Sequence, residues 1–473
     1  MSGTIASKIA IEPALSLDTD SLLSAIADFR ERDIAWFAKS AISRADFVAA
    51  VHSLANRLPD SPYVLNVCQD RYQFMLGFFA ALLRKQINVF PISAASKSVE
   101  EIVARFPQIY CLSDGDIPTQ RVATLMVGKN PSEPIAAVGN NTLSFPARQT
   151  AAMVFTSGTT GEPQCVEKTW GALIHEANIT SAALASAFTD VDQLVATVTP
   201  LHMYGLLQSV IMPLRTGIMI DAAQPLFPAS IREIMGDSKR AKALITTPVQ
   251  LRHCVLEKVE LPNLRSIVCS TAPLDIELAK QAEQFYGVAV FEIFGSTETG
   301  AFAVRRPTTS ATWRVLPGMS VSDSGDALQV NGTHLLSGVV IQDRVRVVDS
   351  QHFEFLGRSS ELIKVGGKRT SLGELNRQLL AIPGVIDGAI FDAGLRSKHF
   401  NEIRLAALLV VAPHTSRDAL LAALRERMDP VFVPKQLRFV DALPRNTAGK
   451  LPKDSLLQAF RQAGRQNQGR RKN

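Results

Sequence analysis

A run of small and hydroxyl-bearing residues is the segment of this chain best suited to hold an anion. It follows the apolar residues 151–155, and its candidate phosphate-binding members are Thr156, Ser157, Gly158, Thr159, Thr160 and Gly161. Hydroxyl groups and backbone N–H groups can converge here on one phosphate, and glycine lets the backbone approach it closely. The run is not a Walker A loop, because Pro163 stands where that pattern needs its second glycine. An ordinary polar turn after a strand is the alternative interpretation.

This run resembles the phosphate loop of the adenylate-forming superfamily, which includes acyl- and aryl-CoA synthetases and adenylation domains. The resemblance implies that a carboxylic acid is activated with ATP and Mg²⁺ to an acyl adenylate and then passed to a thiol. One position differs, because Gln164 stands where the family usually has a lysine that contacts the β- and γ-phosphates. Lys168, four residues further on, is a candidate replacement.

An aromatic-Gly-x-Thr-Glu segment lies about 140 residues further on, in the family's order, and consists of Phe294, Gly295, Ser296, Thr297 and Glu298. Phe294 offers a flat apolar surface for an adenine. Thr297 can hydrogen-bond the α-phosphate, and Glu298 supplies the carboxylate oxygen that Mg²⁺ binds together with phosphate oxygens. Gly295 and Ser296 are expected on the substrate side of the site. Glu298 alone could instead cap a helix.

Residues 200–205 resemble the family motif Pro-x-His-x-x-Gly. The resemblance implies that His202 takes part in catalysis near the carboxylate and the thiol tunnel, and that Tyr204 lines the acid pocket. A lone histidine with a structural role is the alternative.

Ser270, Thr271 and Ala272 follow an apolar run at 267–269, where the family usually has small residues before Ala-Pro-Leu. By the resemblance, Ala272 lines the adenine. Ser270 and Thr271 are bulkier and polar, which predicts a small acid pocket or a polar contact to the acid. A plain strand-to-helix turn is the alternative.

Further positions in the last third of the chain carry roles by resemblance alone. Asp343 is expected to accept the ribose hydroxyls, and Arg358 to reach the ribose or the phosphates. Ser360 occupies the hinge position. Gly366 and Gly367 are expected to line the tunnel through which the thiol arm passes.

The most specific signal near the C-terminus is a Pro-x-x-x-x-Gly-Lys segment at residues 444–450. The resemblance implies that Lys450 bridges the attacking carboxylate and the α-phosphate. A compact ammonium on a flexible stem suits a transient charge of this kind. Loss of such a contact typically lowers a rate by about 10²–10³.

The elements that position these residues are predicted from hydrophobic periodicity. Short apolar runs alternate with helical patterns through residue 300, which predicts buried parallel strands in a layered α/β fold. The runs expected as strands are 63–67, 87–90, 153–155, 194–198, 243–245 and 267–269, and 72–83 is expected as a helix. Alternating residues from about 310 to 357 predict antiparallel strands. The expected domains are a large adenylation domain, residues 1–357, and a small mobile α+β lid, residues 358–473, which carries Lys450.

Composition narrows the function classes. The net charge is +6, and five basic residues stand in the last thirteen positions, so the charge indicates a basic tail and not a nucleic-acid-binding face. No signal peptide is read at the N-terminus. The most apolar segment, 74–83, is half a membrane span and is expected to be a buried helix. Five scattered cysteines without a CxxC pair predict a reduced cytoplasmic protein with buried thiols.

The amino-acid sequences of residues 295–300 and of the loop 313–318 most resemble those of hydroxybenzoate:acyl carrier protein ligases of aryl-polyene and xanthomonadin pigment biosynthesis. That similarity implies a hydroxybenzoate-like acid as substrate and an acyl carrier protein as acceptor, with coenzyme A as the alternative acceptor. A catalytically impaired nucleotide-binding protein is the alternative from another class. It is suggested by Gln164 and by Ile341 and Gln342, which replace the Thr and Gly that precede the family's aspartate.

Overall fold

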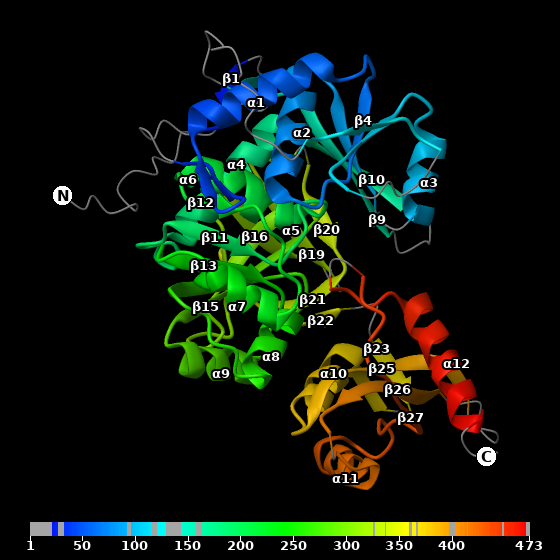
Figure 1. Ribbon diagram of the computed structural model, residues 1–473. Coiled ribbons are helices and arrows are strands. Elements are labelled where there is room, and N and C mark those ends of the chain that lie inside the picture. Colours follow the sequence, from blue (N-terminus) through cyan, green and yellow to red (C-terminus); the bar gives the residue numbers. More distant parts are fainter. Residues whose placement is uncertain are drawn as a thin grey trace.

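The structure is a computed structural model, shown in Figure 1. It describes residues 21–26, 33–91, 96–115, 121–128, 143–157, 163–324, 327–335, 337–358, 362–365, 368–396, 403–413, 415–446 and 449–469. Helices and strands alternate through the first 300 residues, so the expected α/β fold is confirmed. Every run expected as a buried strand lies in or overlaps a strand of the structure.

A six-stranded sheet carries the hydroxyl-rich run at one edge. Its order is β10-β9-β5-β4-β6-β7, and its neighbours are parallel except for the antiparallel pair β9 and β10. The strands are β4 (Tyr63–Asn66), β5 (Ile87–Phe90), β6 (Tyr110–Ser113), β7 (Thr124–Met126), β9 (Thr150–Ser157) and β10 (Pro163–Thr169). The run therefore connects two antiparallel strands, and Gly158, Thr159, Thr160 and Gly161 lie outside the described residues.

Three helices belong to this part of the chain: α1 (Arg44–Arg57), α2 (Arg71–Leu83) and α3 (Ser96–Arg105). The side chain of Asp70 caps α2 by accepting a hydrogen bond from the Gln73 N–H. Almost every side chain of α2 is buried, because the helix is apolar on all sides, and this confirms the expected buried helix. No helix among the described residues is long and apolar enough to cross a membrane.

An eleven-stranded sheet runs through the middle of the molecule, in the order β21-β22-β17-β16-β15-β14-β13-β11-β12-β2-β3 (Figure 1). The consecutive pairs from β15 through β14, β13, β11 and β12 to β2 are parallel, and all other pairs in this sheet are antiparallel. The strands are β2 (Ala35–Phe37), β3 (Ser40–Ile42), β11 (Gln193–Ala196), β12 (Met219–Asp221), β13 (Lys242–Thr246), β14 (Leu264–Cys269), β15 (Ala289–Ser296), β16 (Gly300–Arg305), β17 (Trp313–Val315), β21 (Asp343–Asp349) and β22 (His352–Arg358).

The helices that accompany this sheet are α4 (Trp170–Ala183), α5 (Met203–Leu206), the π-helix η3 (Leu207–Ile211), α6 (Met212–Thr216), α7 (Pro228–Gly236), α8 (Pro248–Leu256) and α9 (Ile276–Tyr286), with a short 3₁₀ turn η2 (Ala185–Ala187). Two small sheets complete this part: β1 (Leu22–Ser24) with β8 (Ser144–Pro146), and β18 (Met319–Asp323), β19 (Leu328–Gly332) and β20 (Val339–Ile341).

The C-terminal residues form their own sheets and hydrophobic cores. A hairpin of β23 (Leu362–Val365) and β24 (Lys368–Ser371) is followed by a three-stranded sheet of β25 (Val385–Arg396), β26 (Ile403–Val411) and β27 (Gln436–Phe439). The helices are α10 (Leu372–Leu380), α11 (Arg417–Arg427) and α12 (Lys453–Gly469). The two cores of this region draw all their buried members from residues 365–463. Helices and strands are both present here, as expected for an α+β region.

The cysteines depart in one position from the expected buried thiols. Cys68, Cys111, Cys254 and Cys269 are buried, and all five thiols are free. Cys165 is exposed, because it lies on β10, which is an edge strand of the six-stranded sheet.

Candidate active site

The candidate residues meet at one edge of the eleven-stranded sheet. The strands β11, β13, β14 and β15 are parallel, so their carboxyl ends lie together. His202 follows β11, Thr271 follows β14, and Glu298 follows β15. The carboxyl edge of a parallel sheet is where ligands bind in open α/β folds.

His202 stands at the N-terminal end of α5, on the loop that leaves β11. Burial, aided by the positive charge of Lys450, lowers the pKa of His202 to about 4. The imidazole is therefore neutral at physiological pH and can hydrogen-bond without carrying charge. The charge of Lys450, which belongs to the C-terminal region, therefore acts on His202.

Tyr204 and Ser270 were expected to line the acid pocket, and their hydroxyl groups are hydrogen-bonded within the fold. The Tyr204 hydroxyl donates to the carbonyl oxygens of Val268 (2.9 Å) and Thr246 (3.3 Å). The Ser270 hydroxyl donates to the Ile293 carbonyl oxygen at 2.9 Å. These bonds connect the ends of neighbouring strands, so both hydroxyls support the edge of the sheet in this structure.

The segment that follows β14 has an unusual backbone. Thr271 has φ of 80°, in the left-handed region that a β-branched residue rarely adopts. A Cβ placed on Gly449 would lie 3.9 Å from the Thr271 hydroxyl and 3.8 Å from that of Thr247, at the N-cap of α8. The segment before Lys450 therefore packs beside the strained residue. Ala272, the expected adenine neighbour, is partly buried next to it.

Hydrogen bonds shape the segment that carries Lys450. The Lys450 N–H donates to the Asn446 side chain at 2.8 Å, and the Asn446 N–H donates to the Lys450 carbonyl at 2.8 Å. Arg445 donates to both carboxylate oxygens of Asp387 at 2.9 and 2.7 Å, and to the Gly449 carbonyl at 2.8 Å. A largely buried ion pair thus fixes the base of the Lys450 segment to β25.

The aromatic-Gly-x-Thr-Glu segment forms the end of β15 and the turn into β16. Phe294 is partly exposed and packs against four aromatic rings, with the Trp313 ring centroid at 5.0 Å. Gly295 is exposed. Ser296 and Thr299 exchange hydrogen bonds of 3.1 Å across the turn. These bonds fix the two ends of the segment that presents Thr297 and Glu298.

Thr297 and Glu298 are suited to Mg²⁺ and a phosphate. Within the part of the chain that the structure describes, their side-chain oxygens form no hydrogen bond, so these atoms are available to a ligand. The same part contains no cluster of three or more His, Cys, Asp or Glu side chains that could hold a metal. One carboxylate combined with phosphate oxygens is a common way for proteins to bind Mg²⁺. The residues present therefore fit Mg²⁺ that arrives with ATP.

The remaining expected positions are only partly described. Asp343 lies opposite Arg358 in the antiparallel pair of β21 and β22. Thr156 is partly buried on β9, opposite Gln164. The side chains of Ser157 and Arg358, and residues Ser360, Gly366 and Gly367, lie outside the described residues.

Sequence reasoning missed three buried polar residues that contact this site. The Glu292 carboxylate accepts a hydrogen bond from the Leu274 N–H at 2.7 Å and pairs with Arg305. Glu176 and His334 bind the turn after Glu298. Their hydrogen-bond partners lie 18 to 125 residues away in the chain, so no local pattern in the sequence singled these residues out.

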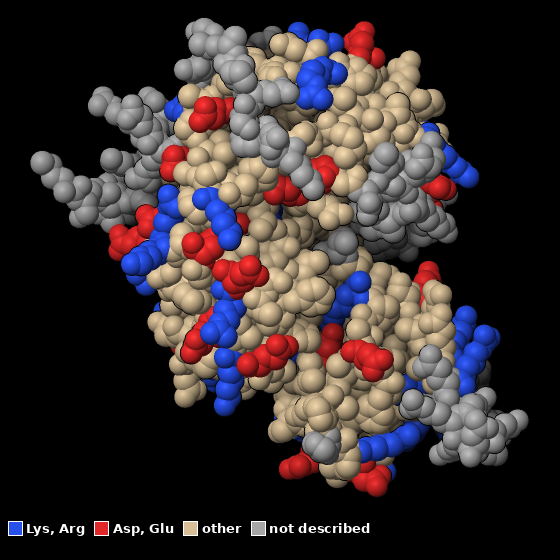
Figure 2. Space-filling model, viewed as in Figure 1, with Lys and Arg blue, Asp and Glu red and all other residues tan. Residues whose placement is uncertain are grey.

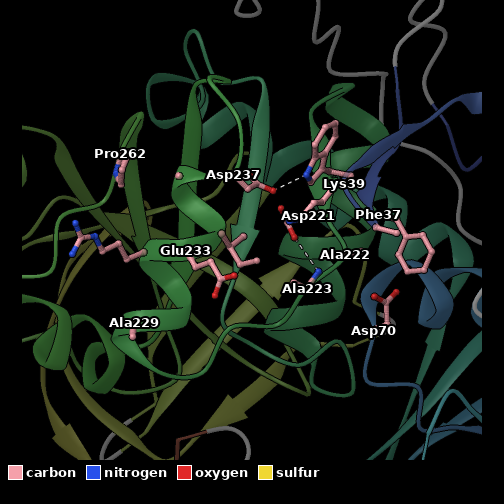
Figure 3. Close-up of a pocket in the computed structure, with 15 residues that line it drawn as sticks. Phe37, Lys39, Asp70, Asp221, Ala222, Ala223, Ala229, Glu233, Asp237 and Pro262 are labelled. Carbon is pink, nitrogen blue, oxygen red and sulfur yellow. Dashed lines mark hydrogen bonds between the residues drawn. The ribbon is translucent and has the colours of Figure 1, made fainter.

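A hollow of about 710 Å³ lies elsewhere, between β2, β12 and α7 (Figure 3). Its lining includes Asp70, Asp221 and Asp237 but none of the candidate site residues. The three carboxylates accept hydrogen bonds from the protein: Asp70 caps α2, Asp221 accepts from Gln193, and Asp237 accepts from Trp36. These carboxylates therefore belong to the scaffold.

Comparisons with known proteins identify the family of this chain. The family model described as AMP-binding enzyme matches residues 34–341. The chain is 29% identical over 311 residues to a 4-coumarate–CoA ligase of Halorhodospira halophila, covering 64% of this chain and 76% of the relative. It is 24% identical over 445 residues to a 2-succinylbenzoate–CoA ligase of Bacillus pumilus, covering 86% and 87%.

Solved structures share the fold. The o-succinylbenzoate CoA synthetase of Bacillus subtilis, in complex with its acyl-adenylate intermediate, superposes with a TM-score of 0.76 at 18% identity, covering 92% of this chain and 98% of that one. The complex of that enzyme with ATP and magnesium gives a TM-score of 0.74 at 19% identity, covering 90% and 96%. The chain belongs to the AMP-binding enzyme family and is an ATP-dependent, AMP-forming ligase that uses ATP and Mg²⁺.

Proposed function

We propose that this ligase activates a small aromatic carboxylic acid, of the hydroxybenzoate type, and transfers it to a phosphopantetheine thiol. Glu298 binds the Mg²⁺ of Mg-ATP, and Thr297 contacts the α-phosphate. Lys450 neutralises charge while the carboxylate attacks that phosphate and pyrophosphate leaves. The observation that carries the proposal is the approach of the Lys450 segment to His202 and Thr271, because it joins distant parts of the chain around one edge of the sheet.

The same arrangement supports a proposed division into two domains. Residues 1–357 are proposed as the adenylation domain and residues 358–473 as a lid. The separate cores of the C-terminal residues support this division. The action of the Lys450 charge on His202 supports an arrangement suited to adenylate formation. Rotation of the lid would then remove Lys450 and admit the thiol.

The aromatic nature of the acid is supported by the names of several relatives. The similar proteins include ligases for 4-coumarate, 2-succinylbenzoate and indoleacetate, and an anthranilate CoA ligase is among the structural neighbours. All four acids carry an aromatic ring. The side chain of Thr271 occupies space beside the Lys450 segment, which favours a small acid over a long one.

Two acceptors are candidates, and each has an observation in its favour. An acidic acyl carrier protein is favoured by charge, because residues 358–473 contain 21 basic and 10 acidic residues. Figure 2 shows Lys and Arg along the edge of this region where α12 lies. Coenzyme A, also an anion, is favoured by the names of the relatives.

A panel of acids tests the proposal, with pyrophosphate release measured in the presence of coenzyme A or of a holo acyl carrier protein. Hydroxybenzoates should give the fastest release, and a preference for long fatty acids would refute the proposed substrate. Lys450→Met should lower adenylation by about 10²–10³, while thiol transfer from a preformed acyl adenylate persists. Wild-type protein that releases no pyrophosphate with any acid would instead support an impaired nucleotide-binding protein.

A further inference from the structure

A group of buried polar side chains lies directly beneath the turn that presents Glu298. Its members are Lys168 (4% exposed), Glu176 (2%) and His334 (4%). They come from three separate segments: Lys168 from β10, Glu176 from α4 and His334 from the residues after β19. Burying charged groups away from water is unfavourable unless they are paired and hydrogen-bonded, so we expect each of these side chains to have specific partners.

Each of these side chains binds the backbone of the turn. The Lys168 ammonium donates to the Glu298 carbonyl oxygen at 3.3 Å. The His334 Nε2 lies 3.1 Å from the Thr299 carbonyl oxygen, to which its N–H donates. The Glu176 carboxylate accepts from the Ala301 N–H at 2.6 Å. Three side chains thus hold peptide groups at three positions along four consecutive residues.

Gly300 makes this close packing possible. Its φ is 67°, and a Cβ on this residue would lie 2.3 Å from the Glu176 carboxyl carbon. No side chain fits there without displacing the carboxylate or the turn. The left-handed backbone conformation and the position of Glu176 therefore depend on each other.

The charges in the group are mutually supportive. Burial lowers the pKa of the Lys168 ammonium, and the neighbouring carboxylates of Glu176 and Glu298 oppose that shift. Burial raises the pKa of Glu176, and Lys168 opposes that shift in turn. Lys168 thus attracts the Glu298 carboxylate as well as binding its carbonyl oxygen.

This role differs from a replacement of the missing phosphate-loop lysine. Gln164 and Lys168 are four residues apart on β10, which corresponds to about 13 Å along a strand. The Lys168 ammonium is directed to the Glu298 turn. The positive charge therefore acts on the residue that is proposed to bind the metal.

We propose that Lys168, supported by Glu176 and His334, is a positioning residue that fixes the Thr297–Glu298 turn in the geometry required for Mg-ATP. The inference rests on the proposed function of Glu298. A purely structural role for Lys168 predicts lower stability without a selective effect on Mg-ATP. The two interpretations therefore differ in which kinetic constant changes.

The test compares Lys168→Met with Lys242→Met. Lys242 is a matched control, because it is fully buried on β13 and donates to the Met235 carbonyl at 2.9 Å and to Asp237 at 2.7 Å, apart from the turn. Lys168→Met should raise KM for Mg-ATP and the Mg²⁺ concentration for half-maximal rate about tenfold, with KM for the acid within twofold of wild type. Calorimetry with a non-hydrolysable ATP analogue and Mg²⁺ should show about tenfold weaker binding. Lys242→Met should lower stability and leave these constants unchanged.

A double variant, Lys168→Met with Glu176→Gln, covers the case in which the single variant does not fold. It removes both buried charges with side chains of similar size, a change that proteins often tolerate. It should show the same weakening of Mg-nucleotide binding. If the wild-type protein is active and the folded Lys168 variant has the same KM for Mg-ATP and the same Mg²⁺ dependence, this inference is wrong but the proposed function is not. Wild-type protein that binds no Mg-nucleotide and releases no pyrophosphate overturns the proposed function.

Discussion

Replacing Thr271 with glycine should relieve backbone strain at the candidate site. Thr271 has φ of 80°, and the left-handed conformation costs an L-residue about 1–2 kcal/mol. Glycine removes this term but adds about 0.5–1 kcal/mol of conformational entropy to the unfolded chain. Since Thr271 is only partly buried, few contacts are lost. We expect Thr271→Gly to be as stable as wild type or up to about 1 kcal/mol more stable.

Urea unfolding of three variants measures this effect. Thr271→Ala removes the same hydroxyl and methyl groups but keeps a Cβ at positive φ, so Thr271→Gly should exceed it in unfolding free energy by about 1 kcal/mol. Lys258→Gly is a matched control, because Lys258 has φ of 50° on the exposed segment after α8. Thr271→Gly should be more stable than Thr271→Ala, and Lys258→Gly should be more stable than the wild-type protein, because each comparison removes a Cβ at positive φ. Only Thr271→Gly should also change KM for the acid.

The result that refutes this reasoning is a Thr271→Gly protein less stable than Thr271→Ala. That order would mean that the Thr271 backbone is not strained, because glycine would then contribute only its entropic cost. An unchanged KM for every acid in the panel would separately refute the placement of Thr271 beside the substrate.

Two further predictions concern ion pairs and protonation. Asp387→Ala should lower the free energy of unfolding by about 3–5 kcal/mol, because it leaves Arg445 largely buried without its partner. Adenylation should also slow, because the Lys450 segment loses its support. The control Glu374→Gln, in an exposed pair, should lower the free energy of unfolding by less than about 1 kcal/mol in the same assay. Burial lowers the pKa of His334 from 6.5 to about 4. Between these pH values the imidazole binds a proton in the unfolded state but not in the folded state, so the free energy of unfolding falls as the pH drops from about 6.5 towards 4. The stability advantage of wild type over His334→Asn should therefore be smaller at about pH 5 than at pH 7.5; an equal advantage at both values would contradict the buried neutral imidazole.

Local sequence determined the types of most elements and the location of the main motifs. Apolar runs between turn residues gave β4, β5, β13 and β14, since burial on both faces leaves a continuous apolar signal. The order of the phosphate-loop, Glu298 and Lys450 segments was sufficient to predict the family, which the family model matches independently. Hydrophobic periodicity and motif spacing are local properties of the sequence, so they can be recognised without a structure.

The tertiary structure decided which polar groups meet. The sequence predicts Tyr204 and Ser270 as pocket residues, and only the structure shows that their hydroxyls donate to strand carbonyl oxygens. Lys168, Glu176 and His334 are up to 166 residues apart in the chain and converge on one turn. The partner of a buried polar side chain depends on non-local packing, because every buried donor or acceptor must be satisfied by whatever the fold brings beside it. The sequence alone therefore determined the chemistry that this protein can attempt, and only the packing of distant segments decided how its reactive turn is held.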